Sequence, residues 1–147
     1  MGKKKIKIEY LLLLLFLFSI IHSHSQGFFT EKLQWYPSNS IVFFQSKDQM
    51  IEWSKERLSF AVAYSKEFTI KGHSIFIAIA DGCSGIHCLA IGVFKEQDGL
   101  WKLVTGTSAR LKEKIMVKLE DDAEKIVFGT TSGKVIGTLP FNIFNDD

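Results

Sequence analysis

The feature that most constrains the fold is a series of short apolar segments separated by turns that contain Gly, Asp or Ser. In 73–80, for example, isoleucines occupy every second position at 75, 77 and 79, as expected of a strand. Gln97-Asp98-Gly99 and Ser132-Gly133 have the composition of tight hairpin turns. Pro140 is expected at a strand end or edge. The expected strands are 40–45, 73–80, 86–96, 100–111, 115–120, 125–131 and 135–144, with 27–37 as a lead-in or edge strand.

Only one segment has a convincing helical pattern. Ser46 is placed as an N-cap before 47–57, and Gln49 follows three residues later, as in a capping box. Residues 58–64 fit either a continuation of this helix to Tyr64 or a strand, and periodicity alone does not separate the two. The longer helix is slightly favoured. Strands spaced by about ten residues therefore predict a β-rich α+β fold: an antiparallel meander sheet, or partly closed barrel, of about six or seven strands with an N-terminal helix packed on it.

The first 25 residues have the layout of a cleaved secretory signal. Four lysines lie within 3–7, the apolar run LLLLLFLFSII follows at 11–21, and Ser23-His24-Ser25 offers small side chains before Gln26. The apolar run is shorter than the roughly 20 residues of a membrane-spanning helix, so we expect no stable membrane anchor after cleavage. The chain is therefore expected to be exported, to a periplasm or outside the cell, as one β-rich domain over 26–147.

Charge argues against a nucleic-acid partner. The whole chain has 18 Lys and Arg against 16 Asp and Glu, but four of the lysines and one glutamate lie in 1–25. The remaining 14 basic and 15 acidic residues are nearly balanced. A near-neutral domain without a basic block has no electrostatic attraction for a polyanion.

Both cysteines lie in one short stretch, DGCSGIHC at 81–88. An exported protein with an even number of cysteines usually oxidises them, which predicts a disulfide between Cys83 and Cys88. Closing so short a loop contributes about 2 kcal/mol in the chain-entropy model. Two alternatives use the same residues: a metal site made of Cys83, Cys88, His87 and His73, or a Cys83 nucleophile activated by His73 or His87. The disulfide is preferred, and neither a metal nor a cofactor is expected.

Three segments resemble known catalytic or ligand-binding motifs, but each lacks a residue or spacing that the motif requires. Gly82-Cys83-Ser84-Gly85 lacks the final glycine of a nucleophile elbow, because Ile86 stands there. The segment 129–134 is one residue short of a phosphate-binding loop and lies between two expected strands. The acidic residues of 120–124 lack the spacing of a calcium loop. The sequence thus favours a non-enzymatic role.

Adjacent aromatic residues are expected mostly in the core, and the alternative is that they contribute an exposed binding patch. Neighbours on a strand face opposite sides, so one member of Trp35-Tyr36 and one of Phe43-Phe44 should point away from the core. An exposed aromatic patch on a small exported domain is typical of a protein-binding surface. The candidate binding residues, taken from this pair and from the cysteine-containing turn, are Trp35, Tyr36, Asp81, Ser84 and His87.

Three functions remain open at this point. The favoured one is a small exported binding protein, such as an inhibitor or a toxin-neutralising immunity protein, whose partner is another protein. The alternatives are a carrier of a small apolar ligand inside a β-barrel and a Cys-dependent enzyme.

Overall fold

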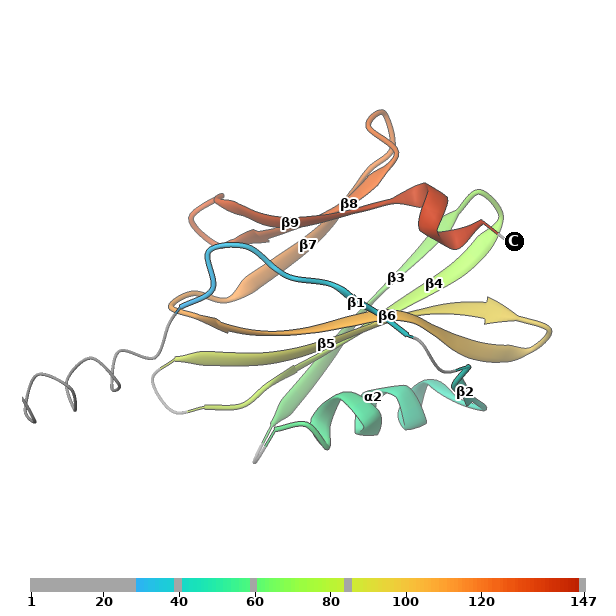
Figure 1. The fold of residues 1–147 in the computed structure, drawn as a ribbon, viewed down its shortest axis with the longest axis horizontal. Helices are drawn as coiled ribbons and strands as arrows, with labels where there is room; N and C mark the ends of the chain where they lie inside the picture. Colours follow the sequence, from blue (N-terminus) through green and yellow to red (C-terminus); the bar gives the residue numbers. More distant parts are fainter. Residues whose placement is uncertain (1–28, 39–40, 59–60, 84–85, 146–147) are drawn as a thin grey trace, which may run out of the picture.

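The computed structural model describes residues 29–38, 41–58, 61–83 and 86–145. Within them the chain forms two antiparallel sheets and an α-helix (Figure 1). The larger sheet contains β1 (Tyr36–Pro37), β2 (Phe43–Phe44), β3 (Val62–Ile70), β4 (His73–Asp81), β5 (His87–Gln97) and β6 (Leu100–Leu111). The smaller sheet contains β7 (Ile115–Glu120), β8 (Lys125–Thr130) and β9 (Val135–Pro140). The helix is α2 (Lys47–Lys55), and a 3-10 turn, η1 (Phe141–Phe144), follows β9.

Strands β3–β6 and β7–β9 form antiparallel meanders, and the short strands β1 and β2 pair with β6, which confirms the predicted β-rich fold class with one helix packed on the sheet. The larger sheet has the order β1-β6-β5-β4-β3, with β2 also paired to β6, and the smaller sheet has the order β7-β8-β9. The two do not close into a barrel. The linker at 112–114, between β6 and β7, is where the chain leaves one sheet for the other. Pro140 ends β9, as expected from its missing N–H.

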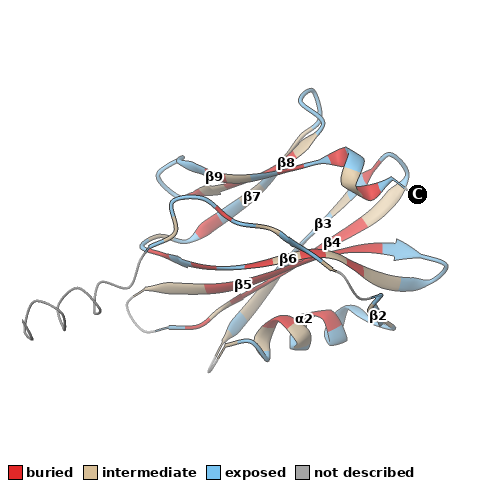
Figure 2. Ribbon diagram, viewed as in Figure 1, coloured by how far each residue is buried: buried red, intermediate tan, exposed pale blue. Residues whose placement is uncertain are grey.

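The larger sheet is the middle of three layers and is buried on both faces (Figure 2). In β4 and β5 a run of residues is buried continuously, as expected of strands with both faces covered. One face packs against the smaller sheet through a core that includes Ile75, Ile77, Ile79, Leu89, Ile91, Ile126, Phe128 and Ile136. The other face packs against α2 through Met50, Phe76, Ala78, Phe94 and Leu103.

The helix begins where predicted and ends earlier. Ser46 caps it, and its Oγ accepts a hydrogen bond from the backbone N–H of Gln49 at 3.3 Å. The helix ends at Lys55, so the prediction that it continues to Tyr64 is wrong. Tyr64 belongs to β3 and pairs with Ile79 of β4. This antiparallel pairing with a buried central strand decides the conformation, which local periodicity left ambiguous.

The segment 29–37 joins the two sheets along one side. At its start, the backbone N–H of Thr30 donates to the carbonyl oxygen of Arg110 on β6 at 2.8 Å. The N–H of Leu33 then donates to the carbonyl oxygen of Ile136 on β9 at 2.6 Å. Further along, the hydroxyl of Thr107 donates to the carbonyl oxygen of Gln34 at 2.6 Å. On the opposite side, β3 and β7 are the outermost strands of their sheets among the described residues.

Candidate functional site

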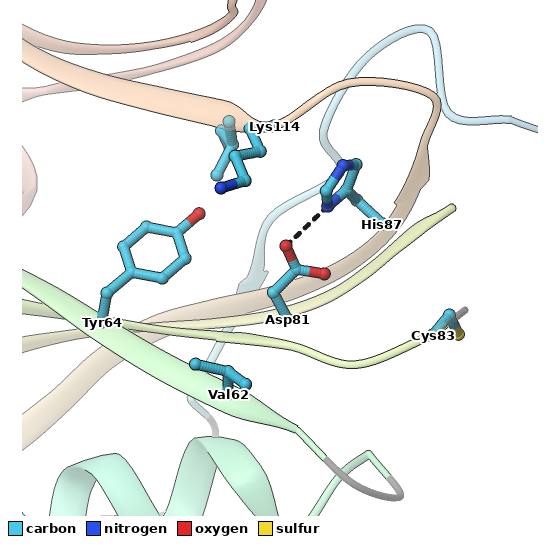
Figure 3. Close-up of a pocket in the computed structure, with 7 residues that line it drawn as sticks. Val62, Tyr64, Asp81, Cys83, His87 and Lys114 are labelled. Atoms are coloured by element: carbon cyan, nitrogen blue, oxygen red, sulfur yellow. Dashed lines mark hydrogen bonds and ion pairs between the residues drawn. The ribbon is translucent and has the colours of Figure 1, made fainter. Parts of the chain in front are cut away.

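A groove of about 540 Å³ lies between β3 and the start of β7, at the end of the larger sheet where β4 passes into β5 (Figure 3). Three segments from distant parts of the sequence meet there. Its lining residues are Val62, Tyr64, Asp81, Cys83, His87, Lys114 and Ile115. The groove thus combines an apolar border with several groups able to form hydrogen bonds or ion pairs.

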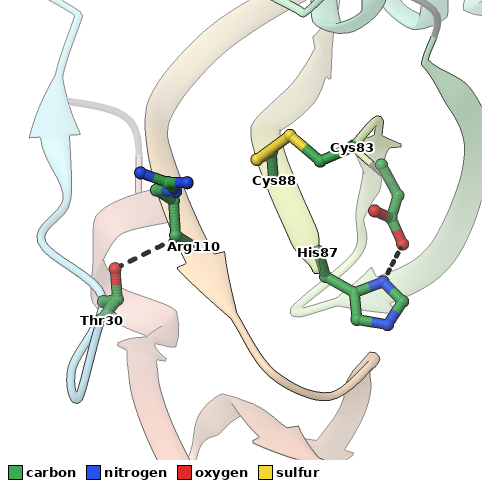
Figure 4. Close-up of a disulfide and its surroundings, with 6 residues drawn as sticks. Thr30, Cys83, His87, Cys88 and Arg110 are labelled. Atoms are coloured by element: carbon green, nitrogen blue, oxygen red, sulfur yellow. Dashed lines mark hydrogen bonds and ion pairs between the residues drawn. A yellow bond between two sulfur atoms is a disulfide. The ribbon is translucent and has the colours of Figure 1, made fainter. Parts of the chain in front are cut away.

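A disulfide holds the loop beside the groove. Cys83 and Cys88 are bonded, with Cα atoms 5.5 Å apart, which confirms the predicted pairing (Figure 4). The N–H of Gly82 donates to the carbonyl oxygen of Cys88 at 3.0 Å and closes the same hairpin. In this oxidised state neither sulfur is a thiolate, the form needed by a nucleophile or a zinc ligand. His73 starts β4 at the far end from Asp81, about 27 Å away at the rise of an antiparallel strand.

Asp81 and His87 face each other across the mouth of the hairpin. Nδ1 of His87 lies 2.6 Å from Oδ2 of Asp81, and both side chains are partly buried. His87 points into the groove, whereas Cys88, its neighbour on β5, points to the other side of the strand (Figure 4). The imidazole therefore hydrogen bonds to the carboxylate at the groove wall, and this contact fixes the orientation of both side chains.

The hydroxyl of Tyr64 is the unusual polar group of the groove. Its oxygen is buried and has no hydrogen-bond partner among the described residues. Burial raises the pKa of Tyr64 to about 12, and the negative charge of Asp81 adds to the effect. The phenol therefore stays protonated at neutral pH and keeps an unused hydrogen-bond donor.

Lys114 supplies the positive charge of the groove. Its exposed side chain extends from the linker that precedes β7, and its ammonium group points toward the hydroxyl of Tyr64 (Figure 3). It makes no ion pair with any residue in the described ranges, unlike Lys118, which pairs with Glu120 at 2.7 Å. A cation and a neutral donor therefore lie together on the side of the groove opposite the disulfide.

Only some of the predicted binding residues lie together in the structure. Asp81 and His87 line the groove, and Ser84 lies outside the described residues. Trp35 packs between the sheets, with its ring 4.8 Å from that of Phe128. Tyr36 is 62% exposed but sits on β1, at the opposite edge of the larger sheet from β3. One member of this aromatic pair thus points away from the core, as predicted.

Tyr64 and Lys114 were not identified from the sequence. Tyr64 falls in the segment whose secondary structure was ambiguous, and Lys114 falls in the linker between two predicted strands. A polar tip on an otherwise apolar strand face was the only sequence signal for Tyr64. Nothing in the sequence indicated that β7 would start beside β3.

The described residues contain neither a candidate metal site nor a candidate membrane-spanning helix. No group of three or more His, Cys, Asp or Glu side chains there is arranged to hold a metal ion. No helix in that part of the chain is long and apolar enough to cross a membrane. No protein-family model, curated protein or solved structure matches the chain. The groove is therefore the feature of the described residues that bears on function.

Proposed function

We propose that this chain is an exported, non-enzymatic binding domain that recognises another protein through the groove between β3 and β7. The observation that carries the proposal is the meeting of Tyr64, Asp81, His87 and Lys114 beside a disulfide-bonded hairpin. Polar groups that converge on a partly apolar hollow are typical of a recognition site. An inhibitor, or an immunity protein that neutralises a toxin, is the activity that best fits such a domain.

The border of the groove carries apolar side chains that could pack against the surface of a partner protein. Val62 at its rim is 73% exposed, and Ile115 adds a buried apolar wall. Such a mixture of apolar surface and polar groups is common at protein interfaces. The disulfide limits the motion of the hairpin before binding, which lowers the entropy lost when a partner docks.

Two observations support export. A disulfide persists in oxidising compartments and is rare in the cytosol. The N-terminal segment 1–25 has the basic, apolar and small-residue regions of a secretory signal. Cleavage before Gln26 would leave intact the segment 29–37, which bridges the two sheets.

The ligand-carrier alternative takes second place. A carrier needs room in its interior, whereas the space between the described sheets is filled by isoleucine and phenylalanine side chains. The groove lies at the edge of this core and contains a hydrogen-bonded Asp–His pair and a lysine, which suit a polar partner better than an apolar ligand.

The test begins with expression of the full chain in a secreting host. We expect the exported protein to have the intact mass of residues 26–147 with one disulfide. This protein then serves as bait for cross-linking mass spectrometry against secreted and envelope proteins. A stoichiometric partner cross-linked around Lys114 supports the proposal. A partner cross-linked only at the β1 edge, retention of 1–25 in the cytosol, or no partner at all would contradict it.

A further inference from the structure

We infer that the groove holds the carboxylate of an acidic side chain on the partner protein, bound between the Lys114 ammonium and the Tyr64 hydroxyl. This inference rests on the proposed function and specifies the chemistry of the partner. Three features of the described residues carry it: a buried donor without a partner among them, an adjacent cation without an ion pair among them, and a neighbouring carboxylate that is already hydrogen bonded to a histidine.

The donor is the phenol of Tyr64. A buried hydroxyl without a partner loses its hydrogen bonds to water and gains nothing in return. Such a group is unfavourable in the free protein, but it becomes favourable when a ligand supplies an acceptor. Since its pKa is raised to about 12, the phenol is protonated at neutral pH and can donate to an anionic oxygen.

The cation is the ammonium of Lys114. It points toward the Tyr64 hydroxyl (Figure 3), and no acidic side chain in the described part of the chain pairs with it. A lysine side chain is flexible and can move aside to admit an oxygen to the phenol. A carboxylate has two oxygens, so one can accept from Tyr64 while the other accepts from Lys114.

The groove contains one acidic group of its own, Asp81, which is hydrogen bonded to a groove histidine rather than to Lys114. Its carboxylate lies 2.6 Å from His87 Nδ1. This contact turns Oδ2 of Asp81 toward the imidazole, and no ion pair joins Asp81 to Lys114 in the described part of the chain. The titratable groups that line the groove are therefore a hydrogen-bonded Asp–His pair, a neutral phenol and one cation. The phenol and the cation lie on the same side of the groove, and both favour an anionic oxygen over a cationic group there.

The site selects a carboxylate over the isosteric amide. An amide presents an N–H₂ group where the second carboxylate oxygen would lie, and Lys114 has no acceptor to offer it. Hydrogen bonds to charged groups are also stronger than those between neutral groups. We therefore expect glutamate to bind at least about tenfold more tightly than glutamine.

The experiment uses two capped peptides, acetyl-Gly-Glu-Gly-amide and acetyl-Gly-Gln-Gly-amide, whose only chemical difference is the side chain. Each is titrated to about 10 mM into the exported, isotope-labelled chain, and backbone amide shifts are followed by NMR, since a single contact of this kind gives millimolar affinity. We expect the glutamate peptide to shift amides around residues 62–64, 81–83, 87 and 114. The glutamine peptide should give much weaker shifts.

Four variants assign the contacts. We expect Lys114→Ala to weaken binding of the glutamate peptide about tenfold and Tyr64→Phe about fivefold, and Lys114→Arg to keep most of the affinity because it keeps the charge. Lys134→Ala, in the β8–β9 turn, is the matched control, since Lys134 is exposed and does not line this groove. Its affinity should equal that of the unmodified chain. The amide spectrum of each variant reports whether its fold is intact.

Several outcomes would overturn the inference: no shifts at about 10 mM peptide, equal binding of both peptides, or folded Lys114→Ala and Tyr64→Phe variants that bind normally. The proposed function fails separately. A protein partner that cross-links at the groove and binds the Lys114→Ala variant with full affinity would support the proposed binding function and contradict the proposed carboxylate contact. If the glutamate peptide binds as expected but no partner is captured, the proposed binding role is what fails.

Discussion

At the scale of single residues, Tyr64 links stability to pH. Its pKa is about 12 in the folded chain against 10.0 for the ordinary side chain, because burial and the charge of Asp81 disfavour the phenolate. Between these two values the unfolded chain loses a proton that the folded chain retains. The free energy of unfolding should therefore fall as pH rises from about 10 to 12, and this part of the fall should be absent in Tyr64→Phe.

The same variant should be harmless at neutral pH. Removing a buried hydroxyl that has no partner in the described structure costs no hydrogen bond, so the free energy of unfolding should stay equal or rise slightly. Urea unfolding at pH 7 and at several alkaline pH values checks both statements. Tyr36→Phe is the matched control, since Tyr36 is largely exposed. If the free energy of unfolding depends on pH in the same way in Tyr64→Phe and in the unmodified chain, the Tyr64 phenol is not desolvated.

The site also shows how far single residues can be identified from the sequence. Asp81 and His87 were selected because they flank the cysteines, and a short disulfide-closed hairpin brings sequence neighbours together. Tyr64 and Lys114 are separated by fifty positions and meet only because β7 begins beside β3. Local patterns contain no information on such a meeting. Trp35 was selected as a binding residue, but it packs on Phe128.

At the scale of secondary-structure elements, the contact of α2 with the larger sheet depends on small residues in the strands. A Cβ atom added to Gly92 of β5 would lie 2.6 Å from an atom of the Phe94 ring and 2.7 Å from one of the Trp53 ring. Neither ring can move freely: Phe94 is fully buried, and the guanidinium of Arg57 stacks 3.4 Å above the Trp53 ring. Glycine at this position therefore lets the helix approach the sheet.

Gly92→Ala should accordingly lower the free energy of unfolding by about 1–3 kcal/mol, the usual cost of an overpacked core. Gly129→Ala on β8 is the control, because the nearest atom to its added Cβ would be at an ordinary 3.4 Å. We expect that variant to stay within about 0.5 kcal/mol of the unmodified chain. Urea unfolding at pH 7 measures both. Equal stabilities for the two variants would mean that α2 can shift without cost.

Most strands could be predicted because a hairpin meander is encoded locally, in alternating apolar residues and turn residues. At the Gln97-Asp98-Gly99 turn, for example, Asp98 and Gly99 both have positive φ, at 53° and 78°. Such angles are typical of a type I′ hairpin. The end of α2 was missed because 58–64 has an ambiguous period, and pairing with β4 decides it. The division into two sheets was also missed, since it depends on whether β6 and β7 pair, which is a property of the tertiary fold.

At the scale of the whole molecule, the segment 29–37 holds the two sheets together along one side. The backbone of Leu33 is hydrogen bonded to Ile136 of the smaller sheet, while Thr105 and Thr107 of the larger sheet donate to carbonyl oxygens of this segment. The Leu33 side chain is only 7% exposed and belongs to the core between the sheets. The sandwich should therefore unfold as one unit, with the segment as part of its core.

Leu33→Ala tests this coupling. Truncating a buried leucine costs about 2–4 kcal/mol, and because Leu33 contacts both layers, amides of β6 and of β9 should lose hydrogen-exchange protection by similar amounts. Lys32→Ala, an exposed neighbour, should leave exchange in both sheets unchanged. Loss of protection confined to β9 would mean that the smaller sheet can detach by itself. In that case the groove between β3 and β7 would also open, and its geometry would depend on the segment 29–37 at the opposite side of the molecule.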